Sequence, residues 1–141
     1  MKLTVENVKL IPTINLLSEL SLKGKESRHR SKIINELKGR AQEVTEQEAE
    51  LIKEHSYLDD EGNPKKTDDG KGYNIKDMDA FVKDTNELYS EVFVLEGGNF
   101  TDPLKTIKQV LLNSDKEWKG QEAEIYDYLC EQLEQEDNDE A

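Results

Sequence analysis

The side chains most suited to chemistry in this sequence are two histidines, one cysteine and many carboxylates. His29 and His55 fall in one predicted helix, where a rise of about 1.5 Å per residue places them about 39 Å apart. They therefore cannot share a metal within one chain, and we interpret each as an exposed or packing histidine. No spacing of histidine and carboxylate typical of a zinc site occurs.

Cys130 is predicted to lie on the apolar side of the last helix, with Asp127, Glu131 and Glu134 as neighbours. A nucleophilic cysteine needs a nearby base and a positive environment, whereas these carboxylates raise the pKa of the thiol. The pattern favours core packing. As the sole cysteine, Cys130 also excludes an intrachain disulfide bond.

Asp59, Glu61 and Asn63 begin like an EF-hand calcium loop, which needs glycine at its sixth position and glutamate at its twelfth. Those positions hold Pro64 and Gly70, so the motif fails and a solvated turn is the better interpretation.

Acid–base catalysis needs carboxylates in a water-poor cleft. Glu48 alone is predicted to be partly buried, and we expect it to pair with a basic residue or to face a gap. No glycine-rich phosphate loop occurs. We therefore predict no enzyme, and no catalytic, cofactor-binding or metal-binding residues.

The most specific feature is a basic cluster near the start of the long helix, comprising Lys23, Lys25, Arg28, Arg30 and Lys32. One interpretation is a site for an anion or an acidic partner, because helix N–H groups and basic side chains converge there. The other is internal neutralisation by the acidic tail or another acidic helix.

The charge of the chain is strongly asymmetric. Residues 1–40 hold nine basic and four acidic residues, whereas residues 41–141 hold ten basic and 28 acidic ones, for a net charge of −13. Most of the molecule therefore repels nucleic acid and anionic membranes, and we expect no direct nucleic-acid binding. No apolar run is long enough to span a bilayer or to form a signal peptide, so we expect a soluble cytoplasmic protein.

The chain is organised around a helix predicted over Ser27–His55. Its inward positions alternate in steps of three and four, as expected for a helix packed nearly parallel to a partner. These positions are Ile34, Leu37, Ala41, Val44, Glu48, Leu51 and His55. A capping-box pattern at Thr45 and Glu48 is compatible with a break, but the apolar register continues across it, which favours one helix.

The other elements complete a mainly α fold, with shorter helices packed on the long central helix and a small two-stranded β element. We expect the strand at Leu3–Val5 to pair with Val92–Leu95. Shorter helices are predicted around Ile14–Leu20, Met78–Val92, Leu104–Leu111 and Trp118–Leu133.

We predict a single domain over residues 1–133. Residues 57–73 form a polar excursion rich in turn residues, which we interpret as a ragged hairpin with tyrosines near its base. Residues 134–141 form an acidic tail that we expect to be disordered.

Three stretches carry a resemblance: the opening Met1–Leu10, the Leu22–Arg28 turn and Gly120–Tyr126. Together they resemble a family of small acidic proteins, a domain of unknown function, from phages and prophages of Gram-positive bacteria. The resemblance covers nearly the whole chain. It implies a phage-encoded protein of the host cytoplasm, with possible association with the virion, and it assigns no site residues.

We therefore expect a non-enzymatic phage accessory protein that binds another protein, of phage or host, in virion or tail assembly. A homodimer is expected if one chain leaves part of the apolar seam uncovered. The alternative is an acidic inhibitor that mimics nucleic acid and blocks a host defence or DNA-binding protein. It predicts the carboxylates of Glu43–Glu54 and Asp115–Glu140 on one exposed face.

Overall fold

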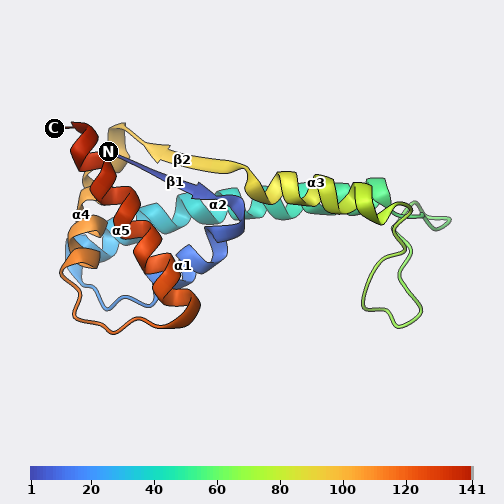
Figure 1. Cartoon of the computed structure of the whole chain (residues 1–141), viewed down its shortest axis with the longest axis horizontal. Coiled ribbons are helices and arrows are strands. Elements are labelled where there is room, and N and C mark those ends of the chain that lie inside the picture. The colour runs from blue at the N-terminus through green and yellow to red at the C-terminus, as the bar shows by residue number, and fades with distance from the viewer. Residues whose placement is uncertain (141) are drawn as a thin grey trace. The chain divides into compact units, whose positions relative to one another are not determined.

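The computed structural model describes residues 1–140, with side chains described as far as Gln135. It confirms the predicted architecture: one long helix packed against shorter helices, with a two-stranded antiparallel sheet (Figure 1). The elements in chain order are β1 (Lys2–Glu6), the 3₁₀ turn η1 (Asn7–Lys9), α1 (Leu10–Ser18), α2 (Gly24–His55), α3 (Met78–Ser90), β2 (Val92–Glu96), the 3₁₀ turn η2 (Gly98–Phe100), α4 (Thr101–Leu112) and α5 (Gly120–Glu140).

The chain divides into two compact units, where the sequence led us to expect a single domain. Unit 1 comprises Met1–Ala41 and Val92–Ala141, and unit 2 comprises Gln42–Glu91. Helix α2 contributes its first part to unit 1 and the remainder to unit 2. Because an α-helix satisfies its backbone hydrogen bonds internally, it can continue from one compact unit into another without a loop.

Unit 1 contains the predicted strand pair. β1 and β2 are antiparallel, with Leu3 opposite Leu95 and Val5 opposite Phe93. The alternation of β1 places Leu3 and Val5 on the buried face, where α5 covers them and also contacts α1 and α4. Most of the core lies here, formed by leucine and isoleucine side chains of α1, α2, α4 and α5.

Helix α2 runs without a break past Thr45 and Glu48, as its apolar register predicted. Its start differs from the prediction, because the helix begins at Gly24 and not at Ser27. Gly24 has a φ of +59°, which glycine adopts without steric cost. Ser27 instead lies in the first turn and accepts a hydrogen bond from Arg30 Nη2 at 3.3 Å.

Unit 2 pairs the second part of α2 with α3. Two contacts fix an antiparallel arrangement: His55 Nε2 lies 2.7 Å from Asp84 Oδ2, and the Tyr89 hydroxyl donates to Glu48 Oε2. Asp77 is the N-cap of α3, and its Oδ1 accepts from the Ala80 amide at 3.2 Å.

Helix α5 differs from the prediction at both ends. The helix begins at Gly120, which has a φ of +60°, so Trp118 lies before it. The Trp118 ring stacks on the Tyr126 ring at 4.5 Å between centroids. Residues 134–140, expected as a disordered tail, continue α5, and residue 141 lies outside the described residues.

Candidate functional site

The structure separates the five basic candidates into two groups. The Arg30 guanidinium faces inward and donates to the Leu17 carbonyl at 3.3 Å and, more closely, to the Leu20 carbonyl. The last carbonyls of a helix lack partners within the helix, and Arg30 donates to one in the last turn of α1 and to one just after the helix. Arg30 is therefore part of the fold and is not available to an anion.

Lys32 is also engaged, since its ammonium lies 5.3 Å from the centroid of the Phe100 ring. His29 Nδ1 is 2.7 Å from Thr106 Oγ1, so the start of α2 is fastened to α4. Lys23, Lys25 and Arg28 are exposed, and none makes an ion pair or a hydrogen bond within the described residues. The sequence-predicted cluster is thus reduced to three free cations at one helix start.

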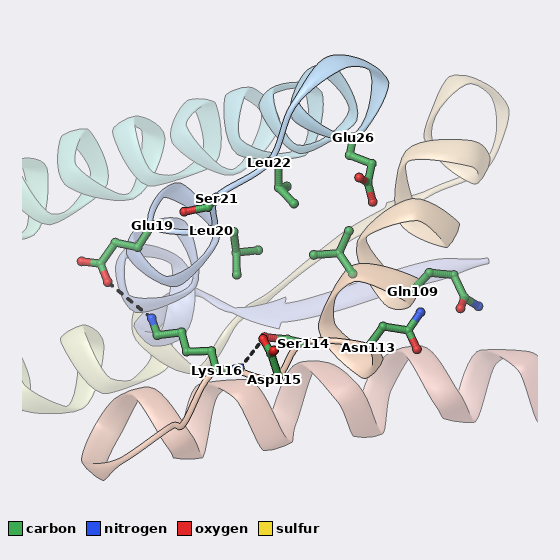
Figure 2. Close-up of a pocket in the computed structure, with 11 residues that line it drawn as sticks. Glu19, Leu20, Ser21, Leu22, Glu26, Gln109, Asn113, Ser114, Asp115 and Lys116 are labelled. Atoms are coloured by element: carbon green, nitrogen blue, oxygen red, sulfur yellow. Dashed lines mark hydrogen bonds and ion pairs between the residues drawn. The ribbon is translucent and has the colours of Figure 1, made fainter.

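A cavity of about 630 Å³ lies beside this helix start, between the turn after α1 and the end of α4 (Figure 2). Its cation, Lys116, is paired: the ammonium lies 4.0 Å from Glu19, 3.3 Å from Glu122 and 4.6 Å from the centre of the Trp118 ring. The other charged groups of the wall are the carboxylates of Glu26 and Asp115. The cavity therefore offers an anion no free positive group, which weakens the anion-site interpretation.

The residues suited to chemistry are occupied by structural contacts. His55, besides facing Asp84, packs edge-on against Phe81 at 5.7 Å between ring centroids. Burial raises the pKa of the Cys130 thiol, and nearby Glu134 and Asp127 raise it further against a lowering by the hydrogen bond with Tyr126. A thiol held in its neutral form is a poor nucleophile, which agrees with the packing role predicted for Cys130.

The polar excursion is an organised structure, which we call the two-loop cap (residues 56–76). Three backbone segments of the cap join around Tyr57, Lys65 and Asn74: the Tyr57 amide donates to Asn74, the Lys65 amide to Tyr57 and the Asn74 amide to Lys65, at 2.8–2.9 Å. Isolated antiparallel bridges at Ser56–Ile75 and Lys66–Tyr73 extend the pairing. The segment predicted as one ragged hairpin is therefore three paired segments joined by two loops.

Each loop of the cap is closed by an aspartate. Asp59 Oδ1 accepts from the amides of Glu61 and Asn63, both at 2.9 Å. Asp69 Oδ1 accepts from Thr67 Oγ1 at 2.5 Å and from the Lys71 amide at 3.0 Å. These are Asx-type turns, in which a short polar side chain replaces backbone partners. Asp59, the first residue of the pattern that resembled a calcium loop, therefore serves the turn itself.

The cap and the start of α3 expose apolar side chains that the sequence did not single out. Their exposed fractions are 55 % for Tyr57, 42 % for Leu58, 40 % for Tyr73, 56 % for Met78 and 46 % for Val82. Single exposed apolar residues are ordinary on protein surfaces, but several on neighbouring segments are typical of binding surfaces. The sequence feature that could have indicated this surface is the pair Tyr57 and Tyr73, which lie at the two ends of a mostly polar segment.

Unit 2 also contains a groove of about 360 Å³ between the second part of α2 and α3. Its apolar groups are Leu51 and Leu88, and carboxylates flank them: Glu50, Glu54, Asp84, Glu87 and Glu91. With 15 acidic and six basic residues, unit 2 has a net charge of −9. Basic surfaces are the electrostatic complement of such a groove.

Among residues 1–140, whose side chains are described as far as Gln135, no group of three or more described side chains is placed to hold a metal ion. None of the helices in that range has the length and apolar character needed to cross a membrane. Comparisons with models of protein families, with curated proteins and with solved structures found no match. The resemblance to phage proteins therefore stays a prediction from the sequence.

Proposed function

We propose that this protein is a non-enzymatic accessory protein that binds another protein through unit 2, and that the partner is a phage structural protein during virion or tail assembly. The observation that carries the binding role is the set of exposed tyrosine and aliphatic side chains on the two-loop cap and the start of α3. The phage context comes from the sequence resemblance alone.

The two-loop cap suits binding because it combines rigid anchors with a defined backbone. Tyrosine buries a large apolar ring at low cost in side-chain entropy and is enriched among residues that dominate interface energies. Tyr57 and Tyr73 are adjacent to backbone groups that are hydrogen-bonded across the cap. A partner would therefore meet side chains on a preformed surface, which reduces the entropic cost of association.

Support for a non-enzymatic role comes from the use of the reactive groups. His29 and His55 hold α4 and α3 respectively, and the Cys130 thiol has a raised pKa. The two histidines thus each have a structural contact, and the Cys130 thiol is held in its less reactive neutral form.

The test is affinity capture by the full chain from a lysate of phage-infected cells, followed by mass spectrometry. We expect wild type to recover a phage structural protein and the double variant Tyr57→Ala/Tyr73→Ala to lose most of it. Val8→Ala/Ile11→Ala is the matched control, because it removes two apolar side chains that are 55 % and 56 % exposed in unit 1. Equal recovery by both double variants would contradict the proposed surface.

A second function, mimicry of nucleic acid, is favoured by one observation. The exposed glutamates of α2 in unit 2 follow one another in steps of three and four residues, at Glu43, Glu46, Glu50 and Glu54. Such steps place one carboxylate on the same face in each turn of the helix. Capture of a basic host nuclease in place of a phage structural protein, in a complex dissolved by salt or displaced by duplex DNA, would favour this function.

A further inference from the structure

The two-stranded sheet of unit 1 has a different environment at each of its two edges. At the β1 edge, the Tyr128 hydroxyl of α5 donates to the Thr4 carbonyl at 2.5 Å. Helix α5 also packs on β1 along the strand. At the other edge, β2 is the outer strand, and β1 lies between it and α1 (Figure 1). The β1 edge is therefore covered by α5, and the remaining edge belongs to β2.

The register of the two strands shows which backbone groups face the outer edge of β2. In an antiparallel pair, positions that exchange hydrogen bonds alternate with positions whose N–H and C=O groups point away from the neighbouring strand. The Thr4 carbonyl is directed to α5, so Thr4 and its partner Val94 occupy positions of the second kind. Val92 and Glu96 lie two residues to either side of Val94 and share its direction. Within the described residues, the outward backbone groups of these three have no hydrogen-bond partner.

Strand β2 lacks the features that usually keep edge strands apart. Proteins protect such edges with lysine, proline or a bulge. β2 contains neither lysine nor proline, and its register with β1 is continuous. On its outer face, Val92 is 54 % exposed and Val94 is 42 % exposed. A β-branched strand with free backbone groups is suited to receive one further strand.

We propose that β2 pairs with β2 of a second copy of this chain, antiparallel, across a two-fold axis at Val94. The pairing that uses the whole strand sets Val94 against Val94 of the other copy, and Val92 against Glu96. The outer edge of β2 thus complements itself, as a two-fold interface requires. Both strands of the sheet belong to unit 1, so the two sheets would join into one through unit 1 alone.

Charge favours a second copy as the occupant of this edge. Glu96 is the only charged residue of β2, and the two-fold pairing sets it against Val92 and not against another carboxylate. Within its own chain Glu96 lies opposite Lys2. Unit 1 holds 13 basic and 17 acidic residues, for a net charge of −4 against −9 for unit 2, so two copies repel each other less through unit 1.

The association should be weak and should persist at high salt. A pair of short strands covers less than the roughly 1,200–2,000 Å² that stable interfaces bury, so we expect a dissociation constant of about 10 μM to about 1 mM. The net charge of −13 on each chain opposes association. Raising the ionic strength from about 0.1 M to about 1 M screens this repulsion, so the dimer should be retained or strengthened.

The experiment is sedimentation equilibrium of the full chain and its variants over a range of protein concentrations. Val94→Lys places two ammonium groups opposite each other at the axis, and we expect it to raise the dissociation constant about tenfold or more. Val94→Glu should do the same with two carboxylates. An equimolar mixture of the two variants sets opposite charges face to face, so it should associate about tenfold more tightly than either variant alone.

Val8→Lys is the matched control, because it makes the same exchange at a valine of unit 1 that is 55 % exposed and lies outside the sheet. We expect it to dimerise like wild type. Val94→Pro tests the hydrogen bonds themselves. It removes the outward N–H, and proline is tolerated where the N–H of an edge strand points to solvent. We expect this variant to lose the dimer and to keep the helical circular dichroism spectrum of wild type.

Several results would overturn the proposal. These are a wild type that is monomeric at about 1 mM, a Val94→Lys variant that dimerises like Val8→Lys, and a mixture that associates no more tightly than its components. A monomeric wild type that captures another protein, with that capture abolished by Val94→Pro, would also overturn it and would assign the edge to a strand of that protein.

Discussion

Units 1 and 2 are stabilised by different kinds of contact. Of the 19 apolar side chains that form the core of the described chain, 17 lie in unit 1, and only Val44 and Leu88 lie in unit 2. Unit 2 instead contains the His55–Asp84 and Tyr89–Glu48 contacts and the hydrogen-bonded loops of the cap. Apolar burial dominates folding free energy, so unit 1 should be the more stable of the two.

This difference suggests a division of labour. A unit with few buried apolar groups opens locally at lower free energy, and binding surfaces are commonly drawn from such regions. The exposed tyrosines of unit 2 and its high negative charge fit that pattern. The following predictions test the contrast between the units, beginning with the largest expected effect.

Truncation of the core should cost far more in unit 1 than in unit 2. Leu111 is fully buried, so Leu111→Ala should lower the free energy of unfolding of unit 1 by about 2–5 kcal/mol, through lost burial and the cavity left behind. Leu51 in unit 2 is half-buried, and Leu51→Ala should cost about 1 kcal/mol.

Urea denaturation measures both effects. Fluorescence of Trp118, the sole tryptophan, reports unit 1, and circular dichroism reports helices of both units. Equal losses from the two substitutions would contradict the contrast between the units.

The Tyr89–Glu48 contact should make unit 2 sensitive to alkaline pH. The hydrogen bond with Glu48, followed by burial and by the charge of Glu48, raises the pKa of Tyr89 to about 12. Below about pH 10 the contribution of Tyr89 to the free energy of unfolding is fully present, because the hydroxyl is protonated in both the folded and the unfolded state. From about pH 10 to about pH 12 the unfolded state loses the proton first, so this stability declines as pH rises.

Tyr89→Phe removes the contact and tests its sign. At pH 9 we expect a loss of about 1 kcal/mol, a value suited to a half-exposed hydrogen bond after solvent screening. The difference in free energy of unfolding between wild type and Tyr89→Phe should then decrease above about pH 10. Tyr73→Phe, which removes a hydroxyl from an exposed ring of the same unit, is the control. A gap that is constant with pH would show that the contact does not govern alkaline stability.

The regular elements were predictable because their signals are local. The seam of α2 follows from helical periodicity, and the pairing of Leu3–Val5 with Val92–Leu95 follows from two short runs of strand-forming residues. The start of α2 was wrong by three residues because the positive φ of Gly24 competes with the capping preference of Ser27.

The candidate site was predicted less well because it depends on contacts distant in sequence. Arg30 belongs to the basic cluster by spacing, yet the carbonyls it binds belong to the residues around the end of α1. The tyrosine of unit 2 that meets Glu48 lies 41 residues away, and no period in the sequence reveals such a pairing. Glu48 was expected to pair with a basic residue or to face a gap, and it accepts a hydrogen bond from a phenol instead.

The smallest predicted effect concerns a single turn of the two-loop cap. The hydrogen bond from Thr67, followed by that from the Lys71 amide, lowers the pKa of Asp69. Thr67→Val should bring the pKa of Asp69 back toward its ordinary value, whereas Thr67→Ser keeps the hydroxyl and should leave it low. In wild type the Thr67–Asp69 hydrogen bond stabilises the folded state at pH values above the pKa that Asp69 has in the unfolded chain. This stabilisation is lost as pH falls through the lower pKa that Asp69 has in the folded chain. Titration of the Asp69 carboxyl by NMR measures the shift, and identical titration curves for the valine and serine variants would mean that the backbone of the loop, and not Thr67, sets its charge.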